Sequence, residues 1–180
     1  MTTFVALFRG INVGGQRAVR MDELKGLHEA LGLKDVVTYI QSGNVVFTSD
    51  DADPTRLLQQ IEDGFAQRFG FHAKVIVRTA AELKDIIANN PFQDQPMKES
   101  KWVAVLFLAT RPESTAQEDL REAYVGPEEF YIIGQELYVY YPNGIGRSKL
   151  SHAFLEKRLK TPVTGRNWNT VLKLQEMIQR

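Results

Sequence analysis

The stretch VVTYIQSGNVVF, residues 36–47, decides how the first half of the chain folds. It contains two runs of β-branched and aromatic residues, Val36 to Ile40 and Val45 to Phe47, separated by a short polar segment with a glycine. Runs of this composition at this spacing predict two antiparallel strands joined by a tight turn. The segments on either side then determine the class of fold.

The flanking segments add strands and helices in a recognisable order. An apolar run at 4–8 predicts a buried strand, and residues 21–31 carry apolar side chains at helical spacing. After the hairpin, Asp53 is suited to cap a helix that ends at Gly70, and residues 74–77 form the next strand-like run. Strand, helix, hairpin, helix, strand is the order of a ferredoxin-like fold.

The second half of the chain begins the same order again. Thr79 and Glu82 have capping-box spacing, which predicts a helix that links the halves. The expected elements beyond it are a strand at 102–108, a helix at 114–124, a hairpin at 130–141, a helix from Ser148 to Lys160 and a final helix bearing Val171, Leu172, Leu174 and Ile178. Similar phrases in the two hairpins, YIQSG at 39–43 and YIIG at 131–134, indicate an internal duplication.

The predicted class is therefore α+β, with two ferredoxin-like repeats of the βαββαβ type packed into one compact unit. The first subdomain is expected to comprise residues 1–92, including the linking helix. The second is expected to comprise residues 93–180, including the C-terminal helix.

Composition restricts the function. The 22 basic and 22 acidic residues give no formal net charge, but residues 141–180 hold eight bases and two acids and form a basic end. Such an end can face phosphate or carboxylate, or it can be a solvated helix face. The absence of cysteine excludes disulfides, thiolate catalysis and cysteine-ligated metals, and it favours a cytoplasmic location. No segment has the roughly 20 apolar residues of a membrane helix.

Three glycine-bearing polar loops follow strand-like runs and are the candidate binding segments: RGINVGG from Arg9, NGIGRSK from Asn143 and TGRNWNT from Thr164. Glycine lets the backbone approach a ligand closely, and a following helix start adds unpaired N–H groups, so each loop can hold a small anion. The candidate ligand-binding residues, including those of the first hairpin turn, are Arg9, Asn12, Gly14, Gly15, Gln41, Ser42, Asn44, Arg147, Ser148, Lys149, Arg166, Asn167 and Asn169.

Each loop also has a purely structural interpretation. The glycines near Arg9 can form an ordinary turn, Ser148 can cap a helix, and Asn167 or Asn169 can cap the last helix above a packed Trp168. The glycine spacings match neither the dinucleotide-binding fingerprint nor the lysine-containing phosphate loop. The three histidines have no metal-binding spacing, so no metal is expected. No motif identifies a catalytic residue, and the cofactor is unknown.

Five phrases, FVALFRGINVGG, TYIQSGNVVF, ANNPF, YYPNGIGRSKL and TGRNWNTVLKL, resemble the bacterial family called domain of unknown function 1697. The resemblance spans nearly the whole chain. It implies two ferredoxin-like repeats and assigns no activity or catalytic residue. Most of the shared polar residues fall in expected loops, where binding residues are common.

Three functions remain open at this stage. The first is a binding module for a small anionic ligand, such as a nucleotide, a phosphorylated metabolite or nucleic acid, held by the three loops where the two repeats meet. The second is a metal-free enzyme, a transferase or hydrolase, in which Arg9 or Arg166 stabilises developing negative charge. The third is a homodimer or other protein-interaction module, because ferredoxin-like sheets can associate through a face or an edge.

Overall fold

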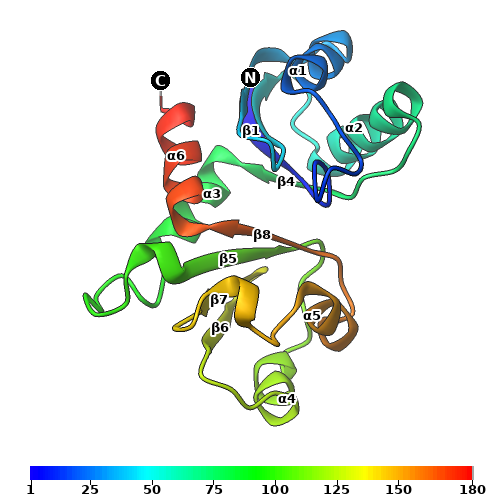
Figure 1. Ribbon diagram of the computed structural model, residues 1–180. Coiled ribbons are helices and arrows are strands. Elements are labelled where there is room, and N and C mark those ends of the chain that lie inside the picture. The colour runs from blue at the N-terminus through cyan, green and yellow to red at the C-terminus, as the bar shows by residue number, and fades with distance from the viewer. Residues whose placement is uncertain (180) are drawn as a thin grey trace. The chain divides into compact units, whose positions relative to one another are not determined.

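The computed structural model describes residues 1–179 and contains two four-stranded antiparallel β-sheets and six α-helices (Figure 1). The predicted mixed α+β class is confirmed. Contacts divide the chain into two compact units, which are described separately. The first unit comprises residues 1–84 and the chain from Leu174 onward, and the second comprises Asp85–Lys173.

The elements of the first sheet and its helices come first along the chain: β1 (Thr2–Phe8), α1 (Met21–Ala30), β2 (Lys34–Tyr39), β3 (Asn44–Ser49), α2 (Pro54–Phe69) and β4 (Val75–Thr79). Helix α3 (Ala80–Ala88) follows directly. The second series is the short 3₁₀ turn η1 (Ser100–Trp102), β5 (Val103–Leu108), α4 (Ala116–Ala123), β6 (Glu129–Ile133), β7 (Glu136–Tyr140), the 3₁₀ turn η2 (Ile145–Arg147), α5 (His152–Leu159), β8 (Val163–Asn167) and α6 (Trp168–Ile178).

The first sheet has the strand order β2-β3-β1-β4, with β1 between two antiparallel neighbours. Strand β1 is fully buried from Phe4 to Phe8, which explains its uninterrupted apolar sequence. Alternate residues of β1 share one core with apolar residues of α1 and α2, such as Leu24 and Phe65. The two helices therefore cover one face of this sheet (Figure 1).

The helix boundaries follow the capping chemistry that the sequence predicts. The Asp53 side chain accepts a hydrogen bond from the Thr55 amide at 3.0 Å, and Gly70 ends α2 with a φ of 78°. At the start of α3, Thr79 and Glu82 form the reciprocal capping box, with N···O distances of 3.2 and 3.1 Å. These local predictions are confirmed.

The second sheet has the strand order β6-β7-β5-β8. Leu106 and its alternate neighbours on β5 share a core with residues of α4 and α5, such as Leu120 and Leu155. Val105 alternates to the opposite face, where it pairs in register with Tyr138 on β7 and Arg166 on β8. This face is also buried, since all three of these side chains are at most 7% exposed.

Two expectations about the last quarter of the chain are wrong. The segment around Thr164 is not a loop, because Val163–Asn167 pairs with β5 as strand β8. Ser148 does not cap a helix that starts beside it. Ser151 is the N-cap of α5 and accepts a hydrogen bond from the Phe154 amide at 3.1 Å. The two serines are three residues apart, and the Ser148 hydroxyl has other partners.

Candidate functional site

The loop that follows β1 is held in place by its own polar residues. The Asn12 amide group donates to the carbonyl oxygens of Val19 and Gln41 at 3.0 and 2.9 Å, and its oxygen accepts from the Val19 amide at 2.7 Å. Arg17 donates to the His72 carbonyl and lies over the Phe71 ring. Asn12 therefore closes the loop and joins it to the first hairpin turn.

The glycines of this loop also have a structural use. Gly14 and Gly15 adopt φ values of 58° and 75° in a tight turn, which the Gln16 amide closes on the Val13 carbonyl at 3.0 Å. Both glycines are exposed. Arg9 is half-buried, and its backbone amide donates to the Lys74 carbonyl. The turn accounts for the glycines without a ligand.

The hairpin turn from Gln41 to Asn44 lies against the same loop. Gly43 accepts a hydrogen bond from the Phe8 amide, and a Cβ on Gly43 would come within 2.6 Å of Ile11. Asn44 is fully buried and donates to the Tyr39 carbonyl and the Ser42 hydroxyl. The two predicted segments of the first unit are thus brought together, although Asn12 and Asn44 use their side chains within the fold.

In the second unit, the loop between β7 and α5 carries the predicted Arg147, Ser148 and Lys149. Gly144 has a φ of 83° and starts the turn η2, and an added Cβ would lie 3.5 Å from the Trp102 ring. Leu150 is buried in the core of this unit and fixes the far end of the loop. The loop is anchored at both ends and leads directly into the first turn of α5.

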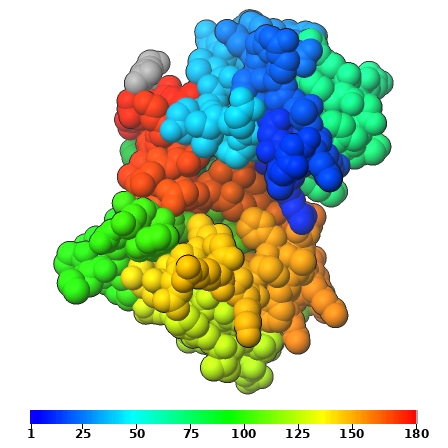
Figure 2. All heavy atoms as spheres, in the orientation of Figure 1, coloured from blue at the N-terminus to red at the C-terminus, as the bar shows by residue number. Residues whose placement is uncertain are grey.

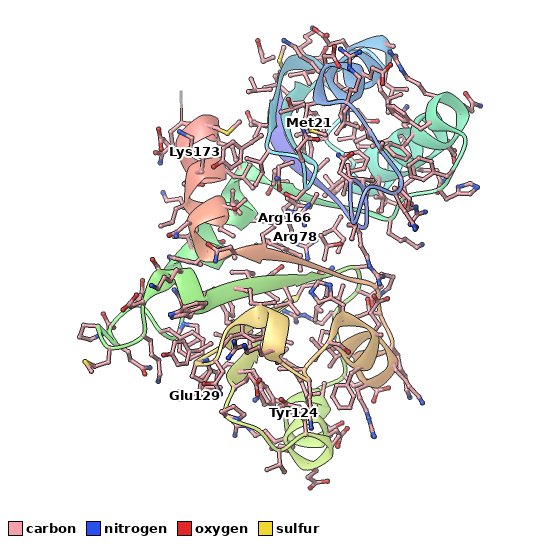
Figure 3. The ribbon with its side chains drawn as sticks, in the orientation of Figure 1. Met21, Arg78, Tyr124, Glu129, Arg166 and Lys173 are labelled. Carbon is pink, nitrogen blue, oxygen red and sulfur yellow. The ribbon has the colours of Figure 1, made fainter. Side chains whose placement is uncertain are left out.

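Ser148 belongs to a three-residue hydrogen-bond cluster. Its hydroxyl donates to one Glu128 carboxylate oxygen at 2.7 Å, and the Tyr124 hydroxyl donates to the other at 2.6 Å. Partial burial acts to raise the pKa of Glu128, but the two hydroxyl donors outweigh it and hold that pKa below its usual value. Burial and the same hydrogen bond raise the pKa of Tyr124 (labelled in Figure 3).

The hydrogen bonds of this cluster fix the loop in place and do not indicate catalysis. Near neutral pH the Glu128 carboxylate stays ionised and the Tyr124 phenol stays protonated, so neither group is placed to exchange a proton there. Ser148 also accepts a hydrogen bond from the Leu150 amide at 3.0 Å. The cluster ties the loop to the chain segment before β6.

Arg147 and Lys149 flank Ser148 and remain exposed. Neither forms an ion pair with a carboxylate of residues 1–179. The Glu128 carboxylate, which is hydrogen-bonded to the loop through Ser148, already accepts two hydroxyl donors. Two exposed cations thus precede the first turn of α5 in the sequence, and the amides of that turn provide further hydrogen-bond donors.

The remaining predicted residues lie on β8 and at the start of α6. Asn167 donates to the Lys101 carbonyl and accepts from the Asn169 amide, so it caps α6. It is one of the two residues that the sequence offered as this cap. Asn169 accepts a hydrogen bond from the Ser100 hydroxyl. Trp168 is buried, as its structural interpretation requires.

Arg166 (labelled in Figure 3) does not join Arg147 and Lys149. It lies on the sheet face opposite α4 and α5, and its guanidinium donates to the Gly165 carbonyl. Burial lowers its pKa to about 10, so the side chain is still charged near neutral pH. The sequence could not show that Arg166 lies on the opposite sheet face, because this follows only once Val163–Asn167 is known to be a strand.

Sequence reasoning missed Tyr124 and Glu128, because the Glu128–Ser148 hydrogen bond spans 20 residues and has no motif. Glu129 (labelled in Figure 3) lies on β6 and forms an ion pair with Lys98 at 2.9 Å. Within the described residues, no group of three or more histidines and acidic residues could hold a metal ion. None of the described helices is long and apolar enough to cross a membrane.

Comparison with known proteins gives a family match and a structural relative. A family model described as "Protein of unknown function (DUF1697)" matches residues 1–138. The structure of conserved bacterial protein SP0830 from Streptococcus pneumoniae is similar, with 26% sequence identity and a TM-score of 0.71. The alignment covers 98% of both chains. No curated protein sequence matched the chain.

Proposed function

The chain belongs to the DUF1697 family of proteins of unknown function, and we propose that it is a binding module for a small phosphate-bearing anion held at the loop before α5. The observation that carries this proposal is the pair of exposed cations, Arg147 and Lys149, with no carboxylate partner in the described chain. A ligand with two anionic oxygens can be bound by both side chains at once.

The position of the pair supports an anion over other ligands. Arg147 ends the turn η2, and Lys149 lies two residues before the N-cap Ser151. The first amides of α5 and the positive end of its dipole therefore point toward the same region. Gly146 leaves open space beside the backbone, so a ligand can approach the main chain there.

The Ser148–Glu128 hydrogen bond supports a fixed site. A loop held in one conformation loses less conformational entropy when it binds a ligand. Because Glu128 is tied by two hydroxyl groups, its charge is partly compensated before an anion arrives. The anchor therefore orients the two cations and limits repulsion from the nearby carboxylate.

Calorimetric titration with inorganic phosphate, pyrophosphate and AMP tests the proposal. We expect the double variant Arg147→Glu, Lys149→Glu to lower the affinity for the best of these ligands by at least about tenfold, since charge-assisted hydrogen bonds contribute about 1.5–3 kcal/mol each. The affinity of the unmodified protein should also fall as salt concentration rises.

The matched control is the double variant Lys25→Glu, Lys84→Glu, which makes the same change in net charge on exposed residues of the first unit. It should bind the ligand as the unmodified protein does. Equal loss of affinity in both double variants would show a general charge effect, and unchanged affinity in the first would reject the site.

We also propose that each unit is one ferredoxin-like repeat and that the two arose by duplication. Both units have the order βαββαβ and the same relative strand order. Their registers support the same alignment, because Val5 pairs with Arg78 on β4 and Val105 pairs with Arg166 on β8. Each arginine is nearly buried at the equivalent edge-strand position.

A further inference from the structure

The groove between α4 and α5 is a second candidate site, separate from the loop before α5. Its main cavity has a volume of about 640 Å³, and an adjoining cavity of about 240 Å³ shares Asp119, Arg158 and Lys160 with it. Both helices lie on the same side of the second sheet (Figure 1). A volume of this size accommodates a ligand of several residues or a comparable small molecule.

The two walls of the groove carry opposite charges. Helix α4 contributes Asp119 and Glu122, and α5 and its C-terminal end contribute Lys157, Arg158 and Lys160. Between the walls lie the half-buried Ala123 and the buried Leu120 and Leu159. In Figure 2 these helices belong to the yellow-green and orange parts of the surface.

The opposite charges are not joined by ion pairs across the groove. None of these five charged residues forms an ion pair within the described chain, although all of them line the same cavity. The Asp119 carboxylate accepts a hydrogen bond from the Thr115 hydroxyl at 3.2 Å, and the Arg158 guanidinium lies 5.6 Å from the centre of the Phe154 ring. These contacts orient the two side chains in their own walls.

Helix electrostatics explain only part of this pattern. Asp119 in the first turn of α4 and the cations in the last turn of α5 complement the helix dipoles. Glu122 lies at the opposite end of α4, where a negative charge is unfavourable. On the groove wall, Glu122 adds a second negative charge on the same helix as Asp119, which suits a cationic ligand group.

We infer that the α4–α5 groove binds a small zwitterion with an apolar body, such as a short peptide with free termini. A purely anionic ligand would be repelled by the α4 wall, and a purely cationic ligand by the α5 wall. A zwitterion places its ammonium group near Asp119 and Glu122 and its carboxylate near Arg158 and Lys160. An apolar side chain between the two termini can then contact Ala123.

The tripeptide Ala-Leu-Ala in four forms tests this inference: with free termini, N-acetylated, C-amidated, and capped at both ends. Amide chemical shifts in an NMR titration of the full chain locate the binding and give the affinities. We expect shifts at α4 and α5, with the free form binding at least about tenfold more tightly than each capped form. Equal binding of all four forms would leave only an apolar groove and overturn the inference.

Two single substitutions assign the termini to their walls. Asp119→Asn should weaken the preference for a free amino group and keep the preference for a free carboxylate. Arg158→Gln should do the opposite. Lys25→Gln on α1 is the control and should change neither. Absence of shifts at α4 and α5 with the free peptide would also overturn the inference.

The outcome is independent of the proposed anion site. The double variant Arg147→Glu, Lys149→Glu should retain peptide binding in the groove, because neither residue lines it. Loss of peptide binding in that variant would place the peptide at the loop before α5 and count against the groove.

Discussion

At the scale of single residues, His28 shows how a polar side chain is accommodated in an apolar core. It is fully buried, its Nδ1 is 2.8 Å from the Leu24 carbonyl oxygen, and its ring lies near those of Phe8 and Phe47. Nε2 has no hydrogen-bond partner in the described chain. Burial therefore lowers the pKa of His28 from 6.5 to about 4.

The pKa of His28 predicts a loss of stability in mild acid. Protonation is more favourable in the unfolded chain, so the free energy of unfolding should fall as pH decreases from 6.5 to 4 and then level off. The loss assigned to this group is about 3 kcal/mol. Urea unfolding at several pH values measures it, with His28→Leu as the comparison.

The difference between the two proteins isolates this residue, because all other titrating groups are shared. Relative to His28→Leu, the unmodified protein should become progressively less stable over that pH range. Parallel stability curves would show that His28 titrates normally in the fold.

Sequence reasoning worked where one residue interacts with its near neighbours. The Asp53 cap, the Gly70 stop and the Thr79–Glu82 capping box involve residues at most four positions from the helix end. Asn12 was harder to interpret, because its hydrogen bond to Gln41 spans 29 residues and gives it a structural role that the local sequence does not show. Such partners depend on tertiary structure that no local pattern encodes.

At the scale of elements, β8 was missed for a related reason. Its sequence, VTGRN, contains a glycine and several polar residues, which favour a turn by propensity. Pairing with β5 nevertheless makes it a strand and buries Thr164 and Arg166. The strands β1 and β5 were predictable because their nearly continuous apolar sequences indicate burial on both faces of the sheet.

The C-terminal end of α2 permits a test of backbone conformation alone. Gly70 has a φ of 78°, and a Cβ there would have no atom within 4 Å. We expect Gly70→Ala to lower the free energy of unfolding by about 1 kcal/mol, because alanine is strained in the left-handed region. Chemical denaturation measures this change.

Gly146→Ala is the matched control for that substitution. A Cβ on Gly146 also meets open space, but Gly146 is not among the residues with positive φ. Its stability should stay within about 0.5 kcal/mol of the unmodified protein. If both alanine variants lost equal stability, backbone strain at Gly70 would not be the cause.

At the scale of the whole molecule, charge is balanced in total and uneven along the sequence. The 22 acids and 22 bases give a sequence pI of about 6.8. Proteins with no net charge associate most readily, because long-range repulsion is absent. We therefore expect the lowest solubility near pH 6.8, as measured by precipitation with polyethylene glycol across a pH series.

The variant Lys25→Glu, Lys84→Glu checks the origin of this minimum. It replaces two positive charges with two negative ones on exposed positions. The solubility minimum should move to lower pH and solubility at pH 7 should rise. A minimum that stays in place would point to a specific contact between molecules.

The first unit is discontinuous in sequence, and this has a consequence for how the protein is made. Residues 85–173 are a continuous stretch, whereas the first unit also uses the chain from Leu174 onward. A ribosome synthesises the chain from the N-terminus, so the later unit has all of its residues before the earlier one does. The half that is translated first is therefore expected to reach its final state last.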